Sequence, residues 1–236
     1  MSPSDLRQPD EDALQPDILA RVSDAAQQPI PASLREALPR FLAHPSPAIL
    51  ATLLATALSA RLALGGFSAA DLLPPLALLL VWPFQEWCIH VFLLHAKPFV
   101  LAGRRFDLAL ARKHRRHHAD PENLAILFIP LASYLYSAPI LALLWWGVTP
   151  RLELALTGIA CHLALALRYE WVHYLIHTRY RPRTAWFRRL WRNHRLHHFR
   201  NERHWWGVSM LAADRMLGTD GDEQSVAPSP TCRTLG

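Results

Sequence analysis

Hydrophobic and polar positions along this chain are arranged in long blocks rather than in short amphipathic periods. Leu124–Val148 contains no charged side chain, and Ala48–Phe67 is interrupted by Arg61 alone. A helix needs about 20 apolar residues to cross roughly 30 Å of hydrocarbon. Both segments are therefore expected to be transmembrane helices.

Two further apolar segments carry polar residues mainly toward one end. Leu72–Leu94 contains Glu86 and His90 near its end, and Leu152–His177 contains Glu170 near its end. Uncharged runs of this length are rare in soluble helices, so a soluble all-helical core is the less favoured alternative. The sequence predicts an all-α, integral-membrane helical bundle of about four transmembrane helices with a cytosolic helical cap that carries the histidine boxes described below.

Polar segments flank this bundle at both ends. Residues 1–32 are rich in Pro, Asp and Gln and lack the apolar core of a signal peptide, so we expect a disordered tail there, and a second one at residues 218–236. Apolar residues at helical spacing in 33–46 fit either a helix lying in the membrane interface or an ordinary solvated helix. Residues 47–217 are left as the membrane domain.

Charge adds an orientation to this picture. The formal net charge is +6, and most basic residues fall in two stretches, 97–116 and 179–203. Short loops rich in Lys and Arg stay in the cytosol, so both stretches and both termini are predicted to be cytosolic. Tryptophans interleaved with the second stretch indicate a membrane interface rather than a nucleic-acid partner. We expect a bacterial inner membrane rather than the endoplasmic reticulum.

The cysteines exclude one kind of redox centre. Cys88, Cys161 and Cys232 are far apart and form no C-x-x-C pair. They predict neither a disulfide framework nor a cysteine-ligated iron site. Electrons for any redox reaction are therefore expected to come from a separate protein.

Histidines are clustered far beyond chance. Of 13 histidines, most lie in four clusters, and two clusters have the spacing H-x-x-H-H. At this histidine frequency that pattern is expected about 0.04 times per chain, so chance does not account for two copies. The clustered residues are His90 and His95; His114, His117 and His118; His173 and His177; and His194, His197 and His198.

Helical geometry indicates that these clusters converge. Residues i, i+3 and i+4 share a helix face, so each H-x-x-H-H can direct three imidazoles to one point. His173 and His177 also share a face, with Glu170 one turn earlier. His90 and His95 lie about 140° apart on an ideal helix and need a helix end or a distortion to converge. Because both pairs end a membrane span, we expect one composite site at the cytosolic boundary.

This number of imidazoles indicates a metal centre. Neutral imidazole binds iron, zinc, copper and nickel, so ligand type does not name the metal. All the clustered histidines are expected to be ligands, and they suit two five- or six-coordinate ions with an open position better than one tetrahedral zinc. Glu170 is the acid expected to act at the catalytic site. Other acids that could orient the rings are Glu86, Asp120, Glu122 and Glu202.

Other kinds of metal protein fit less well. A haem needs only one or two axial ligands, a transporter would place polar groups near mid-membrane, and a zinc hydrolase of the usual type would show H-E-x-x-H. The sequence has no such motif. A non-catalytic membrane metal or haem binder is kept as the alternative from another class.

In these boxes the chain resembles the fatty acid hydroxylase and sterol desaturase superfamily, over about residues 82–219. The matching motifs are HVFLLH from His90, HRRHH from His114, HYLIH from His173, HRLHH from His194 and GVSMLAADRMLGT from Gly207. The resemblance implies a four-span fold with a cytosolic cap and a centre of two iron ions, with zinc possible in their place. It also implies the use of O2 and a separate electron donor of the cytochrome b5 or ferredoxin type.

The expected activity is hydroxylation of a membrane lipid on its acyl chain near the polar end. The segment HRRHHADPEN is similar to the fatty acid or sphingolipid 2-hydroxylase branch, while a sterol or carotenoid hydroxylase or desaturase of the same superfamily is the alternative. Desaturation uses the same oxidant, so hydroxylation and desaturation are not separated by sequence. The acyl chain is expected to run along Trp82, Phe84, Trp87 and Phe92 toward the metals.

Overall fold

The structure of this protein is a computed structural model that describes residues 29–235. The tail predicted at residues 1–32 therefore lies, up to residue 28, outside the described residues. In chain order the elements are α2 (Leu34–Ala43), α3 (Pro45–Leu64), the 3-10 turn η2 (Ala69–Leu72), α4 (Leu73–Cys88), the π-helix η3 (Ile89–Leu94), β1 (Phe99–Leu101), β2 (Arg104–Phe106), α5 (Ala109–Ala119), the 3-10 turns η4 (Leu124–Ile126) and η5 (Leu131–Ser133), α6 (Tyr134–Val148), α7 (Leu152–His177), α8 (Ala185–Phe199) and α9 (Ala212–Met216).

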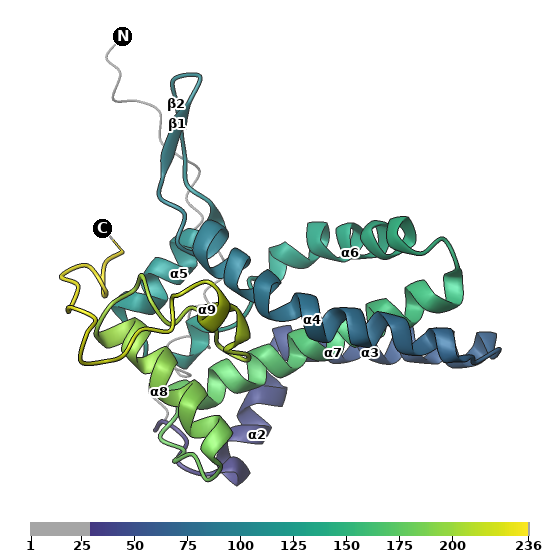
Figure 1. The fold of residues 1–236 in the computed structure, drawn as a ribbon, viewed down its shortest axis with the longest axis horizontal. Helices are drawn as coiled ribbons and strands as arrows, with labels where there is room; N and C mark the ends of the chain where they lie inside the picture. Colours follow the sequence, from purple (N-terminus) through teal and green to yellow (C-terminus); the bar gives the residue numbers. More distant parts are fainter. Residues whose placement is uncertain (1–28, 236) are drawn as a thin grey trace, which may run out of the picture.

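Four segments are long and apolar enough to cross a membrane: Pro45–Leu64, Ala69–Leu94, Leu124–Val148 and Leu152–His177. They confirm the four predicted spans, and the chain is an integral membrane protein with a helical-bundle fold. Figure 1 shows α3, α4, α6 and α7 extending together to one side, while α5, α8 and α9 gather at the other end. We call that second end the cap end.

Outward-facing leucines cover the bundle. Leu80 is 74% exposed and Leu135 is 83% exposed. Such exposure would be costly in water, but it suits a surface that faces lipid chains. The sides of the bundle are therefore matched to hydrocarbon.

Helix α7 is the central helix of the bundle. It packs against α3, α4 and α6, and its apolar residues belong to each of the three hydrophobic clusters. At Gly158 a Cβ atom would lie 2.3 Å from the ring of Trp145 in α6. This glycine therefore allows α6 and α7 to approach closely.

The charge inside the first span is satisfied within the bundle. Arg61 is 3% exposed and its guanidinium donates to Asp71 Oδ1 at 2.5 Å, to Thr157 Oγ1 at 3.0 Å and to the Gly65 carbonyl at 2.6 Å. A buried charge is tolerated only when it is paired and hydrogen-bonded. These contacts tie α3, η2 and α7 together.

The amphipathic segment before the first span forms α2. Ser33 caps it, and Ala37 and Phe41 are buried against α7 and its neighbours. Leu34 and Leu38 stay 45% and 46% exposed. The exposed leucines suit the membrane interface, and that placement stays a prediction.

The C-terminal segment, for which the sequence predicts a disordered tail at 218–236, packs onto the cap end as a series of turns up to residue 235. Val226 and Leu235 are buried, and Arg233 donates to the Ala119 carbonyl at 2.6 Å. Its Gly-, Pro- and Ser-rich composition resembles that of a tail. A few apolar side chains can nevertheless be buried when a folded surface already exists for them.

A short β-hairpin, not predicted by the sequence, is added to this helical fold. β1 and β2 pair in antiparallel register, with Phe99 opposite Phe106, and the turn passes through Gly103 at φ +73°. The hairpin projects from the bundle near η3 and α5 (Figure 1).

Candidate metal centre

The histidines of the four predicted boxes all meet at the cap end, in two groups of five. Within each group the candidate ligand atoms lie within 4.8 Å of one another. Group A contains His90, His95, His114, His118 and His197; group B contains His117, His173, His177, His194 and His198.

Each H-x-x-H-H box is divided between the two groups. In α5, His114 and His118 belong to group A and His117 to group B, whereas in α8 the middle histidine, His197, is the one in group A. The expectation that one box directs three imidazoles to one point was therefore wrong. On a helix, positions i and i+4 differ by only about 40°, whereas i+3 lies about 60° away on the other side.

The first box converges through a distortion, as its spacing requires. Ile89–Leu94 is a π-helix, and the His95 backbone N–H donates to the His90 carbonyl at 3.1 Å, an i to i+5 bond. A π-turn contains more residues per turn than an α-helix, so side chains five apart return to the same face. Both rings consequently reach group A.

The nitrogen spacing within the groups fits metal ions. The Nε2 atoms of His90 and His114 are 3.1 Å apart, as are those of His177 and His194. Nitrogen ligands about 2.1 Å from an ion and at right angles to each other would be about 3 Å apart. A neutral imidazole has only one N–H to donate, so five converging rings are poorly satisfied by hydrogen bonds among themselves.

Several buried imidazole nitrogens have no hydrogen-bond partner. Both ring nitrogens of His117 and Nε2 of His173 are buried and have no hydrogen bond. Burial also holds the pKa of His117 and His194 well below the ordinary range, with neighbouring histidines adding to the effect. The rings are therefore neutral at pH 7, which is the form that binds a metal.

Backbone carbonyls orient three rings of group A. The accepting carbonyls are Trp206 O for His90 Nδ1 at 2.6 Å, Cys232 O for His118 Nδ1 at 2.8 Å and His204 O for His197 Nδ1 at 2.8 Å. A carbonyl can only accept, so each Nδ1 carries the proton and Nε2 presents its lone pair to the group. None of these acceptors is an acid of the kind that the sequence suggested.

Two carboxylates hold the loop that supplies one of those carbonyls. Glu86 accepts hydrogen bonds from the Val208 N–H, from the Ser209 N–H and hydroxyl, each at 2.6 Å, and from Trp82 Nε1 at 3.1 Å. Glu86 was one of the acids that the sequence offered as a candidate for orienting a ring. Instead it fixes residues 208–209, next to the carbonyl of Trp206.

Asp214 is the carboxylate that sequence reasoning missed. It accepts from the backbone N–H groups of Trp206 at 2.9 Å and Gly207 at 2.6 Å, and from the Thr219 hydroxyl at 2.5 Å. Burial raises the pKa of Asp214, which these hydrogen bonds oppose. The signal was present in the closing motif, where a glycine, an aspartate and a G-T pair follow the last box.

The other candidate acids differ in position. Glu202 is buried and accepts from the Thr231 hydroxyl at 2.7 Å, whereas Asp120 and Glu122 are exposed. Glu170 is buried and its Oε1 accepts from the Ser46 hydroxyl at 2.5 Å and the Ile129 N–H at 2.8 Å. Glu170 is in neither histidine group, and its catalytic role stays a prediction.

The remaining histidines lie outside both groups. His162 pairs with Gln85 at 3.0 Å, His44 stacks on Phe128 with ring centroids 3.7 Å apart, and His204 contributes only its carbonyl. His162 is thus a hydrogen-bonded residue within the bundle.

An apolar cavity of about 700 Å³ reaches the histidines. Side chains of α3, α4, α6 and α7 line it, and it ends on His114 of group A and on His117 and His173 of group B. It therefore joins the interior of the bundle to both groups.

The cavity follows a different face of α4 from the one expected. Trp82 lines it, but Phe84, Trp87 and Phe92 do not; Phe92 is 64% exposed, and Trp87 donates to the Thr219 hydroxyl at 3.1 Å. The lining residues of α4 and η3 are Trp82, Gln85, Glu86, Ile89, Leu93 and Leu94. These residues repeat at helical spacing from Trp82, so one face of the helix lines the cavity.

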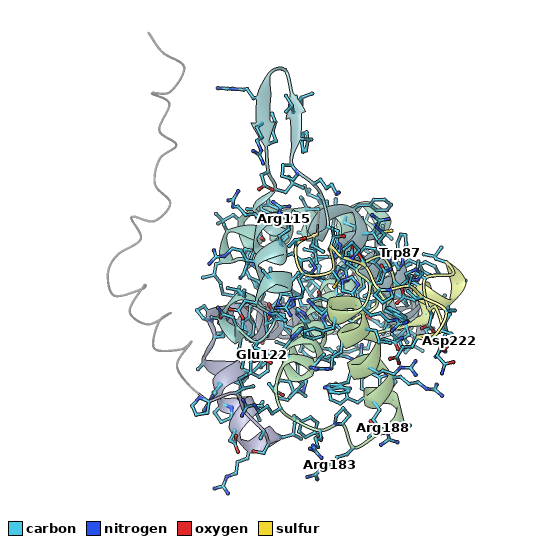
Figure 2. All side chains as sticks on the ribbon, turned by 90° about the vertical axis from the view of Figure 1, so that its left-hand side faces the viewer. Trp87, Arg115, Glu122, Arg183, Arg188 and Asp222 are labelled. Carbon is cyan, nitrogen blue, oxygen red and sulfur yellow. The ribbon has the colours of Figure 1, made fainter. Side chains whose placement is uncertain are left out.

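Exposed arginines lie on the cap end. Figure 2 looks onto this end and shows Arg183 and Arg188 at its lower edge and Arg115 near the base of the hairpin. Exposed arginines suit anionic headgroups or an acidic protein.

Comparison with known proteins adds independent findings. Residues 75–219 match the family model for fatty acid hydroxylases. The chain is 28% identical over 141 residues to the dihydroceramide fatty acyl 2-hydroxylase FAH2 of Arabidopsis thaliana, covering 59% of this chain and 57% of that protein. It is 24% identical over 158 residues to FAH1 of the same plant, covering 65% and 63%. The chain thus spans about three fifths of the length of these relatives.

A solved structure shares the fold. The hydroxylase domain visible in full-length Scs7p matches with a TM-score of 0.59 and 21% identity, over 77% of this chain and 66% of that one. At this identity the match shows a common architecture.

Proposed function

Because this chain belongs to the fatty acid hydroxylase family, we propose that it is an O2-dependent di-iron membrane oxygenase that hydroxylates a lipid on its acyl chain near the polar end. One observation carries the proposal: an apolar cavity of about 700 Å³ is lined by histidines of both group A and group B. An acyl chain placed in it would present a C–H bond to both groups at once.

The two groups would each hold one metal ion through neutral imidazoles. Their spacing and unpartnered nitrogens fit iron, and also zinc in its place. Two bound irons would supply the reductive activation of O2 that hydroxylation of an unactivated C–H bond needs. Glu170, one turn before His173, is the acid we propose to act beside this centre.

The protein residues would position the substrate and exclude water. Carbonyls of the 204–206 loop and of Cys232 fix the rings of group A. The apolar walls between α3, α4, α6 and α7 bind the chain and keep bulk water from the oxidised carbon. Reactive intermediates are thereby protected from side reactions.

The shape of the cavity favours an extended chain as substrate. It runs along α7 from His173 to Leu156, which is about 25 Å of helix at 1.5 Å per residue. Two relatives named as dihydroceramide fatty acyl 2-hydroxylases support an acyl substrate. A sterol or carotenoid oxidase, or a desaturase, is the second candidate because the oxidant would be the same.

The electron donor and the topology belong to the same proposal. Both termini and the metal centre would lie in the cytosol, at a bacterial inner membrane. A separate cytochrome b5 or ferredoxin type protein would supply electrons, and the exposed Arg183 and Arg188 at the cap end suit an acidic partner.

Comparative lipidomics under ¹⁸O₂ tests the function. Cells with the protein should contain a lipid that gains one ¹⁸O atom in its acyl chain, and cells with the His197→Ala variant should lack it. The proposal would be contradicted if neither gain of ¹⁸O nor loss of two hydrogens were found in any lipid, or if a soluble metabolite were the only labelled product. A lipid that loses two hydrogens without gaining oxygen would favour the desaturase.

A further inference from the structure

Lys113 occupies an unusual position at the wall of the cavity. It lies in α5 directly before His114, and its side chain is partly buried and lines the same cavity as His114 and His117. Its Nζ donates to the Phe128 carbonyl at 2.6 Å. Among the cavity-lining residues that the structure describes, Lys113 is the one lysine or arginine.

The charge of Lys113 has no direct counter-ion in residues 29–235. The ion pairs formed there involve arginines. Glu170 is the acid that acts on Lys113 electrostatically; its Oε1 is bonded to Ser46 and Ile129 and its Oε2 has no hydrogen-bond partner, but no ion pair joins it to Lys113. A cation at the wall of an apolar cavity costs free energy unless an oxygen ligand reaches it.

An ammonium group has three protons to donate. The Phe128 carbonyl takes one of them, so two are left for a ligand. The neighbouring basic residues are engaged elsewhere or turned outward: Arg115 bonds Asp107 and the Ala96 carbonyl, and Arg116 is exposed. Lys113 is thus the basic group available to a molecule inside the cavity.

We propose that Lys113 binds the carbonyl or carboxylate oxygen at the polar end of the acyl chain and so determines which carbon lies beside His114 and His117. The inference rests on the proposed lipid oxidation and names the residue that sets its position. Because Lys113 directly precedes His114, an oxygen held there keeps the adjoining carbons at the metal-facing end of the cavity. Oxidation then falls close to the carbonyl.

The test compares Lys113→Met, Lys113→Arg and the control Arg116→Met, which changes an exposed residue of the same helix. Each full-length protein is purified with its metals in lipid nanodiscs. Binding is measured for an N-acyl lipid and for its alkyl analogue, in which a methylene replaces the carbonyl. Wild type and Arg116→Met should prefer the N-acyl lipid about tenfold, because a hydrogen bond to a charged group is lost with the analogue.

Lys113→Met should bind both lipids alike, keep its metal content, and give products oxidised at several carbons in place of one. Lys113→Arg should restore most of the preference. An unchanged preference and product position in Lys113→Met would overturn the proposal, as would loss of metal, since Lys113 would then support the centre itself.

Failure of the proposed function would look different. A Lys113-dependent binding preference without any oxidation by the wild type would contradict lipid oxidation and leave the binding role intact. Oxidation by the wild type with no role for Lys113 would contradict only this inference.

Discussion

The two histidine groups offer the same ligand type and number but are built differently. Group B comes from three regular helices, with His173 and His177 paired one turn apart on α7. Group A takes His90 and His95 from a π-turn and the residue after it, and carbonyls of loops late in the chain bond its rings. In group B, His173 and His177 bond backbone carbonyls of Leu127 and Pro121, between α5 and α6. Regular helices carry every histidine of group B, whereas group A also depends on irregular backbone.

This difference predicts unequal fragility. Helical ligands are held by many repeated backbone bonds along α5, α7 and α8. A carbonyl on a loop stays in place only while other contacts hold the loop. Changes to the contacts that hold the late-chain loops around Trp206 and Cys232 should therefore weaken group A and spare group B.

Removing one ligand from each group should have the largest effect. His177→Ala should release the metal of group B and His197→Ala that of group A, and each should lower activity by more than about 100-fold because both ions are needed. Metal analysis with Mössbauer spectra of anaerobically purified protein would count the remaining irons; His44→Ala, outside both groups, is the control. Full metal content in both variants, a haem Soret band or a single zinc in the wild type would refute the two-ion centre.

Loosening the loop beside Trp206 should have an intermediate effect. Glu86→Gln places an amide where four donors converge, so residues 208–209 should shift and His90 should lose its fixed orientation. We expect about a 10- to 100-fold weaker affinity for the metal of group A alone. Glu122→Gln is the matched control, because Glu122 is exposed. If both variants weakened metal binding equally, or if only group B bound its metal more weakly, the proposed difference between the two groups would be wrong.

Removing the last residues should have the smallest effect of the three. Truncation after Pro228 deletes the Cys232 carbonyl that orients His118, and about tenfold weaker binding in group A is expected. Cys232→Ser keeps the backbone carbonyl and should bind metal as the wild type does. Metal titrations of both proteins would decide, and a defect in Cys232→Ser would assign the role to the thiol instead.

The bundle and the clustering of the histidines could be predicted from the sequence. Four spans follow from runs of apolar residues, because crossing the hydrocarbon needs length and apolarity that are visible in one dimension. The ten histidines follow from short spacings along helices, and even the need for a distortion at His90 and His95 follows from the 100° step. The fatty acid hydroxylase family was recognised on the same residues.

The tertiary structure decided how those parts are combined. It divided each H-x-x-H-H box between two groups, and it placed the carboxylates of Glu86 and Asp214 against the backbone of the 206–209 loop. It also placed the apolar cavity along Gln85 of α4 and Ile89 of η3, and not along Phe84 and Phe92, where the acyl chain was expected.

The physical reason is the range of the interactions. Membrane insertion and helical spacing depend on residues within a few turns of each other, so the sequence of this protein alone specifies its spans and its histidine faces. Hydrogen bonds such as those from His118 to the Cys232 carbonyl, or from Ser209 to Glu86, join residues more than 100 positions apart. Their partners are backbone atoms that every residue possesses, so only the folded chain selects which carbonyl orients which ring.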